Sequence, residues 1–168
     1  MCLLGNNGSG KTTLVNLLTG ILEPEQGDSV LNFGGRTLSL KRNPKEFRSY
    51  VRLCQQDDFL FEELTIKEHI QLVSKLRGIC EPTEIFRTVD EKAAEVGISQ
   101  DLLDKPIKFV SPGARRKLSI AMALIGDAKL IIFDEPTSNL DLKSREKIWK
   151  LIRRIISQHH DRAILIST

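Results

Sequence analysis

The sequence predicts an α/β fold with a mainly parallel sheet and an inserted α-helical subdomain. Short apolar runs, which are typical of buried strands, alternate with amphipathic segments at both ends of the chain. Such an alternation of strands and helices predicts a parallel sheet. The middle of the chain carries almost only helical patterns. We therefore expect an α/β core from residues 1–64 and 127–168 and a helical subdomain from residues 65–126 within a single domain.

Composition narrows the class of protein. The chain has 168 residues, of which 40% are hydrophobic and 28% are charged, as in an ordinary globular domain. Its net charge of +3 is small and scattered among acidic residues, so charge alone does not indicate a nucleic-acid or membrane partner. No apolar run approaches the roughly 18 residues that span a bilayer. Three widely separated cysteines form no disulfide framework and no metal-binding pair, which fits a reducing compartment.

Local signals predict the elements of the first half. Residues 1–4 form the end of a buried strand. Residues 11–19 form a helix that Gly20 ends. Residues 28–40 are typical of a hairpin that turns at Gly34 and Gly35, and residues 50–54 alternate as a strand does.

The second half begins with helices and ends with strands. Thr65 and Glu68 form a capping-box pattern that opens a helix to about residue 77. A second helix is expected over 83–96, a loop with a short turn over 98–110, and a third helix from Ser111 to about residue 125. The run at 129–133 is continuously apolar, as expected for the central strand of a parallel sheet. A helix over 143–158 and a strand over 162–168 complete the chain.

A phosphate-binding pattern follows the first strand. The stretch GNNGSGKT, residues 5–12, fits G-x-x-x-x-G-K-[ST] between a predicted strand and a predicted helix. Glycines let backbone amides surround phosphate, and the start of the helix favours an anion. In this pattern Lys11 pairs with the β- and γ-phosphates and Thr12 binds Mg²⁺. A glycine-rich turn with a chance Lys-Thr is the alternative, and the strand and helix around the motif argue against it.

Two carboxylates follow the central strand. In LIIFDE, residues 130–135, a buried strand delivers Asp134 and Glu135 to its carboxyl end, where ligands bind in open α/β sheets. Asp134 is a candidate ligand of Mg²⁺ through water, and Glu135 is a candidate general base that polarises an attacking water. An Asp-Glu pair alone is a weak signal because acidic residues often end strands. Together with the phosphate loop it indicates a nucleotide-hydrolysing site.

The order of these motifs resembles the nucleotide-binding domain of ABC transporters. A phosphate loop (Walker A), a loop glutamine, a helical insert, a Ser-x-Gly helix start, IIFDEPTS (Walker B) and NLD follow one another over essentially the whole chain. LCQQDDFLFEELTIKEHI and RRKLSIAMALIGDAKLIIFDEPTSNLD look most similar to the A subfamily, whose members move lipids. The resemblance implies a P-loop NTPase core with an inserted helical subdomain, and ATP with Mg²⁺ as the ligands.

The resemblance also implies roles for individual residues. Gln56 matches the glutamine that contacts Mg²⁺ and the attacking water, with Gln55 as its rival; a loop glutamine is otherwise usually solvated. Asp141 matches an acidic residue that crosses to a partner domain, although it can simply cap the following helix. Catalytic roles fall to Lys11, Gln56 and Glu135, and metal contacts to Thr12, Gln56 and Asp134. The residues implied to contact nucleotide are Gly5, Asn6, Asn7, Gly8, Ser9, Gly10, Lys11, Thr12, Thr13, Gln56, Ser111, Gly113 and Asp141.

The expected partners follow from the same family. Two such domains face each other head to tail, and each ATP lies between one phosphate loop and the other domain's signature serine. Transmembrane domains are expected on the same longer gene product or on another chain, at the cytoplasmic face of a membrane, and no nucleic-acid partner is expected. The alternatives are a non-catalytic or regulatory nucleotide-binding domain, and a soluble ABC-type ATPase acting on ribosomes or chromosomes. The sequence has no sustained heptad repeats of the kind that a long coiled coil needs, which argues against an ABC-type ATPase acting on chromosomes.

Three departures from the family pattern stand out. The family's adenine-stacking aromatic residue and its switch histidine fall outside the sequence, so we expect a domain truncated at both ends. His159 and His160 precede the last predicted strand and are expected at the end of a basic helix. The family signature L-S-G-G-Q reads VSPGA at residues 110–114. Pro112 has no N–H and Ala114 has no side-chain amide, so we expect a sound helix start and a weakened ATP clamp. Arg115, Arg116 and Lys117 are then expected as surface cations.

Overall fold

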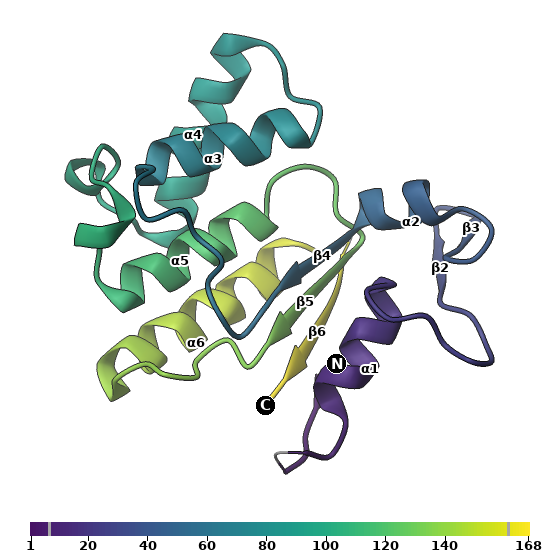
Figure 1. Cartoon of the computed structure of the whole chain (residues 1–168). Coiled ribbons are helices and arrows are strands. Elements are labelled where there is room, and N and C mark those ends of the chain that lie inside the picture. The colour runs from purple at the N-terminus through teal and green to yellow at the C-terminus, as the bar shows by residue number, and fades with distance from the viewer. Residues whose placement is uncertain (7, 161) are drawn as a thin grey trace. The chain divides into compact units, whose positions relative to one another are not determined.

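The computed structural model describes residues 1–6, 8–160 and 162–168, and the chain divides into two compact units (Figure 1). The sheet unit comprises Met1–Gln55, Asp127–Pro136 and His159–Thr168. The helical unit comprises Gln56–Gly126 and Thr137–Gln158. The subdivision expected from the sequence, with boundaries at residues 65 and 126, stays a prediction.

A four-stranded parallel sheet is the framework of the sheet unit. Its order is β1 (Cys2–Leu3), β6 (Ala163–Ser167), β5 (Leu130–Asp134) and β4 (Val51–Cys54), and each neighbouring pair is parallel. Figure 1 shows β4, β5 and β6 side by side. β5 is central and almost fully buried, which explains its continuous apolar run. The predicted α/β class with a mainly parallel sheet is confirmed.

The rest of the sheet unit encloses a small apolar core. α1 (Lys11–Thr19) contributes the fully buried Val15, and the antiparallel hairpin of β2 (Val30–Phe33) and β3 (Arg36–Ser39) contributes Leu38. These side chains pack with Ile132 and Leu165 of the sheet. α2 (Pro44–Tyr50) was not expected from the sequence. It has seven residues and only Phe47 is buried, so it is too short to show a helical period.

Helices form the second unit. α3 (Ile66–Leu76), α4 (Pro82–Val96) and α5 (Pro112–Ala123) pack against one another, and α6 (Leu142–Gln158) belongs to the same unit. The capping box is present: the Thr65 N–H donates to Glu68 Oε2 at 2.7 Å and the Glu68 N–H donates to Thr65 Oγ1 at 3.1 Å. Between α4 and α5 the chain makes two 3₁₀ turns, Gln100–Leu102 and Ile107–Phe109, of which the sequence predicted only the first.

Candidate nucleotide-binding site

The carboxyl edge of the parallel sheet gathers the predicted phosphate loop and the predicted acidic pair. The Gly5 N–H, just after β1, donates to the Thr168 carbonyl at 3.4 Å, and the Thr168 N–H donates to the Leu3 carbonyl at 3.0 Å. Asp134 is the last residue of β5, and it pairs in register with Ser167 of β6. Parallel strands end at one edge, so residues far apart in sequence meet there. Within the sheet unit, the sequence-predicted Lys11, Asp134 and Glu135 are brought together.

The phosphate loop depends on glycine at specific positions. Gly8 and Gly10 have φ of 81° and 92°, in a region that side-chain-bearing residues rarely adopt. A Cβ added to Gly5 would lie 2.6 Å from Ser9 Oγ and 3.3 Å from Ser9 Cβ, so a side chain there would require Ser9 to shift. The Ser9 N–H donates to the Asn6 carbonyl at 3.1 Å and closes the turn, and α1 begins at Lys11. Asn7 lies outside the described residues.

Lys11 points its ammonium group back into this loop. Its side chain is 7% exposed, and Nζ donates to the carbonyls of Gly5 at 2.8 Å and Asn6 at 3.3 Å. Glu135 Oε1 lies 3.8 Å from the same nitrogen. Lys11 therefore joins the phosphate loop to the acidic strand end within one cluster. A phosphate group that enters the loop competes with these oxygens for the ammonium group.

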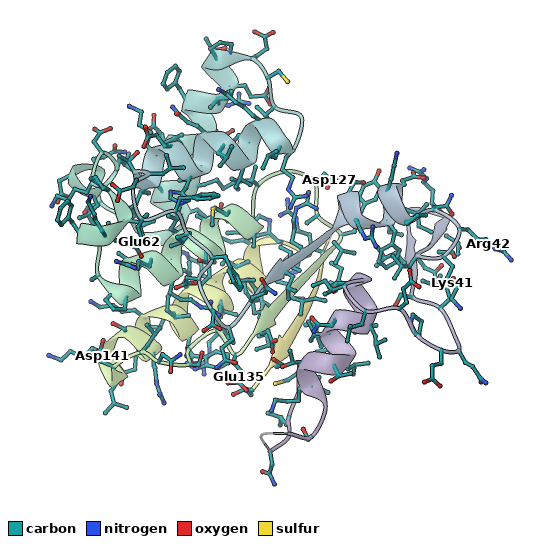
Figure 2. The ribbon with its side chains drawn as sticks, viewed as in Figure 1. Lys41, Arg42, Glu62, Asp127, Glu135 and Asp141 are labelled. Atoms are coloured by element: carbon teal, nitrogen blue, oxygen red, sulfur yellow. The ribbon has the colours of Figure 1, made fainter. Side chains whose placement is uncertain are left out.

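Asp134 and Glu135 are held by a residue that the sequence did not single out. The Ser167 hydroxyl donates to Asp134 Oδ1, and the Glu135 N–H donates to the Ser167 carbonyl at 3.1 Å and to its hydroxyl at 3.2 Å. Glu135 has φ of 41°, a left-handed conformation that is uncommon outside glycine (its side chain is labelled in Figure 2). Strained backbone of this kind often occurs at functional positions. No sequence signal marks Ser167, because strand order and register decide its neighbours.

The oxygen groups of this edge fit magnesium. Thr12 and Thr13 lie in the first turn of α1 and are exposed, and the Asp134 carboxylate is buried at the end of β5. Among the residues that the structure describes, no group of three or more His, Cys, Asp or Glu side chains can hold a metal alone. Mg²⁺ usually takes one or two protein oxygens together with phosphate oxygens and water. The Thr12 hydroxyl and the Asp134 carboxylate are such a donor set.

In the helical unit, Ser111 has the geometry of a helix cap. It precedes α5, and its hydroxyl accepts the Ala114 N–H at 3.4 Å. Pro112 takes the first helical position, where its missing N–H costs no helical hydrogen bond. Gly113 provides one of the first amides of α5, which have no carbonyl partner within the helix. The predicted helix start is therefore present, with one fewer amide donor than a Gly-Gly signature offers.

Asp141 caps α6. Its Oδ1 accepts the Ser144 N–H at 3.1 Å and its Oδ2 accepts the Ser144 hydroxyl at 2.6 Å. The Ser144 hydroxyl is the main cause that lowers the pKa of the Asp141 carboxyl below its ordinary value, followed by the backbone N–H of Ser144. The capping alternative for Asp141 is thus realised in the structure. A role across a domain interface stays a prediction.

Positive charge gathers beside Ser111. A cavity of about 140 Å³ is lined by Ser111 and by residues of α5 and α6, including Lys117 and Lys147. The pKa of Lys117 is lowered, mainly by burial and then by repulsion from Lys147 and Arg154. Lys117 Nζ donates to the Gly97 carbonyl at 2.6 Å. Clustered cations raise the local attraction for anions such as phosphate.

Gln56 lies in the loop that follows β4, with an exposed side chain and a bonded backbone. Its carbonyl accepts a hydrogen bond from Arg116 Nη1 at 3.2 Å. Arg116 was expected as a surface cation, and this expectation is wrong, because the residue is only 2% exposed and also pairs with Asp58 at 3.0 Å. The loop is acidic and covers the arginine, a pairing that local sequence cannot reveal.

Comparison with known proteins establishes the family. A sequence profile described as "ABC transporter" matches residues 1–138. The chain belongs to the ABC transporter family, and within it this chain forms an ATP-binding domain with the P-loop NTPase fold.

Individual relatives agree with this assignment. Phospholipid-transporting ATPase ABCA3 of Homo sapiens is 37% identical over 166 residues, which cover 99% of this chain and 9% of that protein. ABC transporter A family member 11 of Dictyostelium discoideum is 42% identical over 151 residues, covering 89% of this chain and 17% of that protein. The chain therefore spans a small part of these relatives, and its resemblance to the A subfamily is confirmed.

A solved structure supports the fold. cbiO1 from Clostridium perfringens, described as part of the ABC transporter complex cbiONQ, superimposes with a TM-score of 0.83 at 29% identity. The superposition covers 99% of this chain and 65% of that chain.

Among the described residues, no helix is both long enough and apolar enough to cross a lipid bilayer.

Proposed function

We propose that this chain binds and hydrolyses ATP, and that the hydrolysis powers transmembrane movement of a lipid-like substrate. The observation that carries the proposal is the cluster at the carboxyl edge of the sheet, where Lys11 contacts the phosphate loop and lies 3.8 Å from Glu135. The lipid-like substrate is supported by the names of the relatives, since ABCA3 is a phospholipid-transporting ATPase. Attachment to transmembrane domains at the cytoplasmic face of a membrane is part of the same proposal.

Each residue of the cluster has a distinct task in this proposal. The amides of residues 5, 6 and 8–13 surround the phosphates of ATP, and Lys11 exchanges its carbonyl partners for β- and γ-phosphate oxygens. Glu135, released from Lys11 as the ammonium turns to phosphate, accepts a proton from the attacking water. Gln56 orients that water. Thr12, Asp134 and Gln56 would hold Mg²⁺, which would neutralise developing charge on the phosphates.

The partner in this proposal is a second nucleotide-binding domain in head-to-tail contact. Ser111, Gly113 and Asp141 of this chain face the partner's ATP, while the partner's signature faces Lys11. The two sites then differ, because the VSPGA signature lacks the Pro112 N–H and a side-chain amide at Ala114. A charge-assisted hydrogen bond contributes about 1.5–3 kcal/mol, so the site that borrows Ser111 is the weaker one.

Mg-ATP turnover tests the proposal. The purified chain should hydrolyse ATP, and Lys11→Ala should lose at least ~10²-fold in turnover, as expected when a charge that stabilises the transition state is removed. Lys41→Ala, a change to an exposed lysine of the same unit, is the matched control. Turnover that is equal in Lys11→Ala and in the unchanged chain would contradict the proposal.

The asymmetry has its own test in an assembled transporter. Glu135→Gln should abolish most of the hydrolysis, because it removes the base of the stronger site. Ser111→Ala should have a small effect, because it alters a site that is already weak. Equal loss of turnover in both variants would refute the asymmetry.

A second candidate function is regulatory, and the altered signature favours it. Pro112 at the start of α5 removes an amide from the element that clamps the partner's ATP. In this alternative the chain binds nucleotide and docks on another such domain as a regulatory partner, because ATP held against its VSPGA signature is clamped too weakly to be hydrolysed. Measurable ATP binding with no turnover above the Lys11→Ala control would support it.

A further inference from the structure

An acidic loop and a basic helix start are bound together within the helical unit. Residues 56–64 carry four carboxylates, and three of them pair with cations of residues 108–116. Glu62, labelled in Figure 2, receives two hydrogen bonds from Arg115, at 2.7 and 3.3 Å. Lys108 pairs with Glu63 at 2.8 Å. Two backbone hydrogen bonds, from the N–H groups of Ile107 and Lys108 to the carbonyls of Leu64 and Glu62, align the same segments.

Arg116 differs from the other cations of this contact. Its side chain is 3% exposed, compared with 27% for Arg115 and 43% for Lys108. Its Nη1 donates both to Asp58 Oδ1 at 3.0 Å and to the Gln56 carbonyl at 3.2 Å. Hydrogen bonds to charged groups are stronger when they are shielded from water, and removing one partner leaves the other poorly solvated. Arg116 is therefore the most buried of the three cations that attach to the loop.

The loop near Gln56 depends on this attachment. Residues 55–61 form neither helix nor strand, and their described backbone hydrogen bonds include a short turn from the Leu60 N–H to the Asp58 carbonyl. The Phe61 N–H donates to His69 Nε2 at 2.9 Å at the far end of the segment. At the end next to β4, the Gln56 carbonyl accepts the hydrogen bond from Arg116. The backbone that carries the exposed Gln56 side chain is thus hydrogen-bonded to α5.

We infer that Arg116 is a positioning residue for Gln56, acting through the Gln56 carbonyl and the Asp58 carboxylate. The inference rests on the proposed role of Gln56 in orienting the attacking water. Because Arg116 lies in the first turns of the helix that Ser111 caps, a shift of this helix start moves the Gln56 backbone with it. One chain thereby links the element that contacts the partner's ATP to the glutamine that serves its own ATP.

Two measurements on the purified chain test the inference, and they use four single variants and one double variant. Arg116→Met removes both hydrogen bonds while keeping an aliphatic stem, and Arg116→Lys keeps the charge. Gln56→Ala removes the proposed functional side chain. Lys108→Met is the matched control, because it removes another cation that pairs with the same loop without touching Gln56. The measurements are hydrogen exchange of the amides of residues 55–61 and steady-state Mg-ATP turnover.

Arg116→Met should speed exchange of these amides several-fold and lower kcat at least ~10-fold with little change in KM, because misplacement of an orienting group slows the chemical step. Arg116→Lys should recover part of kcat. The Gln56→Ala, Arg116→Met double variant should be no slower than Gln56→Ala alone. Lys108→Met should keep the kcat of the unchanged chain.

Several outcomes overturn the inference. Unchanged exchange in Arg116→Met shows that the arginine does not hold the loop. Full kcat in Arg116→Met beside a defective Gln56→Ala shows that the hold is structural only, and it leaves the proposed function intact. Full activity of Gln56→Ala removes the proposed role of Gln56 together with the inference and leaves ATP hydrolysis by the chain intact. No turnover above Lys11→Ala in the unchanged chain removes the proposed function together with the inference, while the exchange data still show whether Arg116 holds the loop.

Discussion

The phosphate loop and the signature segment are both helix starts rich in glycine and serine, yet they are built differently. At the phosphate loop, backbone conformation determines the structure: Gly8 and Gly10 adopt positive φ, and parallel strands hold the loop in place. At the signature segment, side chains determine the structure: Ser111 caps α5, and Arg116 bonds the helix to a loop. A motif that rests on backbone geometry tolerates few substitutions. A motif that rests on caps and ion pairs can lose Gly and Gln and still fold, which is what VSPGA shows.

The first prediction compares one glycine from each segment. Gly10→Ala should destabilise folding by about 1–3 kcal/mol and weaken ATP binding, because alanine is strained at φ of 92°. At Gly113 an added Cβ lies 3.0 Å from the Ser144 hydroxyl, and the better helix propensity of alanine offsets this contact to within about 1 kcal/mol. Urea unfolding and ATP titration measure both effects. A larger loss of stability at Gly113 than at Gly10 would contradict the comparison.

The sequence predicted the sheet-edge site because its logic is local. A strand, a glycine-rich loop and a helix follow one another at residues 1–19, and Asp134 and Glu135 end an apolar run. Parallel strands then bring both groups to one edge whatever the strand order. Ser167 could not be predicted in the same way. Its hydrogen bonds to Asp134 and Glu135 depend on β6 lying beside β5, which no local pattern encodes.

The helical unit shows the opposite balance. The capping box at Thr65 and the cap at Ser111 were readable because the partners are three residues apart. The burial of Arg116 could not be predicted from the sequence, because its partners Asp58 and Gln56 lie far away in the chain. A run of cations in the first turn of a helix opposes the helix dipole, which should have indicated that anionic groups lie nearby. The unfavourable cations at the start of this helix were therefore the sequence signal that could have predicted the acidic partners of Arg116.

The second prediction separates capping from phosphate binding at Ser111. Ser111→Ala should lower the free energy of unfolding by about 1 kcal/mol, because the Ala114 N–H loses its acceptor. Ser111→Asp should restore this stability, since aspartate caps helices as well as serine does. Chemical denaturation of the three proteins measures the difference. If Ser111→Asp is as unstable as Ser111→Ala, then Ser111 does not stabilise α5 as a cap.

Restored stability in Ser111→Asp also sharpens the comparison between the two segments. Its added negative charge repels the phosphate of a partner's ATP, so ATP-dependent pairing of domains should still be weakened in this variant. A variant that folds normally and pairs poorly would show that cap and clamp are separate properties of one side chain. The phosphate loop offers no such separation, because its fold and its binding surface are the same backbone.

The third prediction concerns the smallest effect, the ionisation of Asp141 at the start of α6. The hydrogen bonds from Ser144 lower the pKa of this carboxyl in the folded protein, so its contribution to stability is present above the unfolded-state pKa of about 3.9 and is lost as the pH falls through the folded-state value. Ser144→Ala removes the first cause of the shift. The pKa of Asp141 should therefore rise towards its ordinary value while remaining lowered by the backbone N–H. NMR titration of the carboxyl carbons measures this, with Glu68 as the internal control because its own lowered pKa depends on Thr65. An unchanged pKa of Asp141 would show that the Ser144 hydroxyl is not its partner in solution, and the cap of α6 would then rest on the backbone alone.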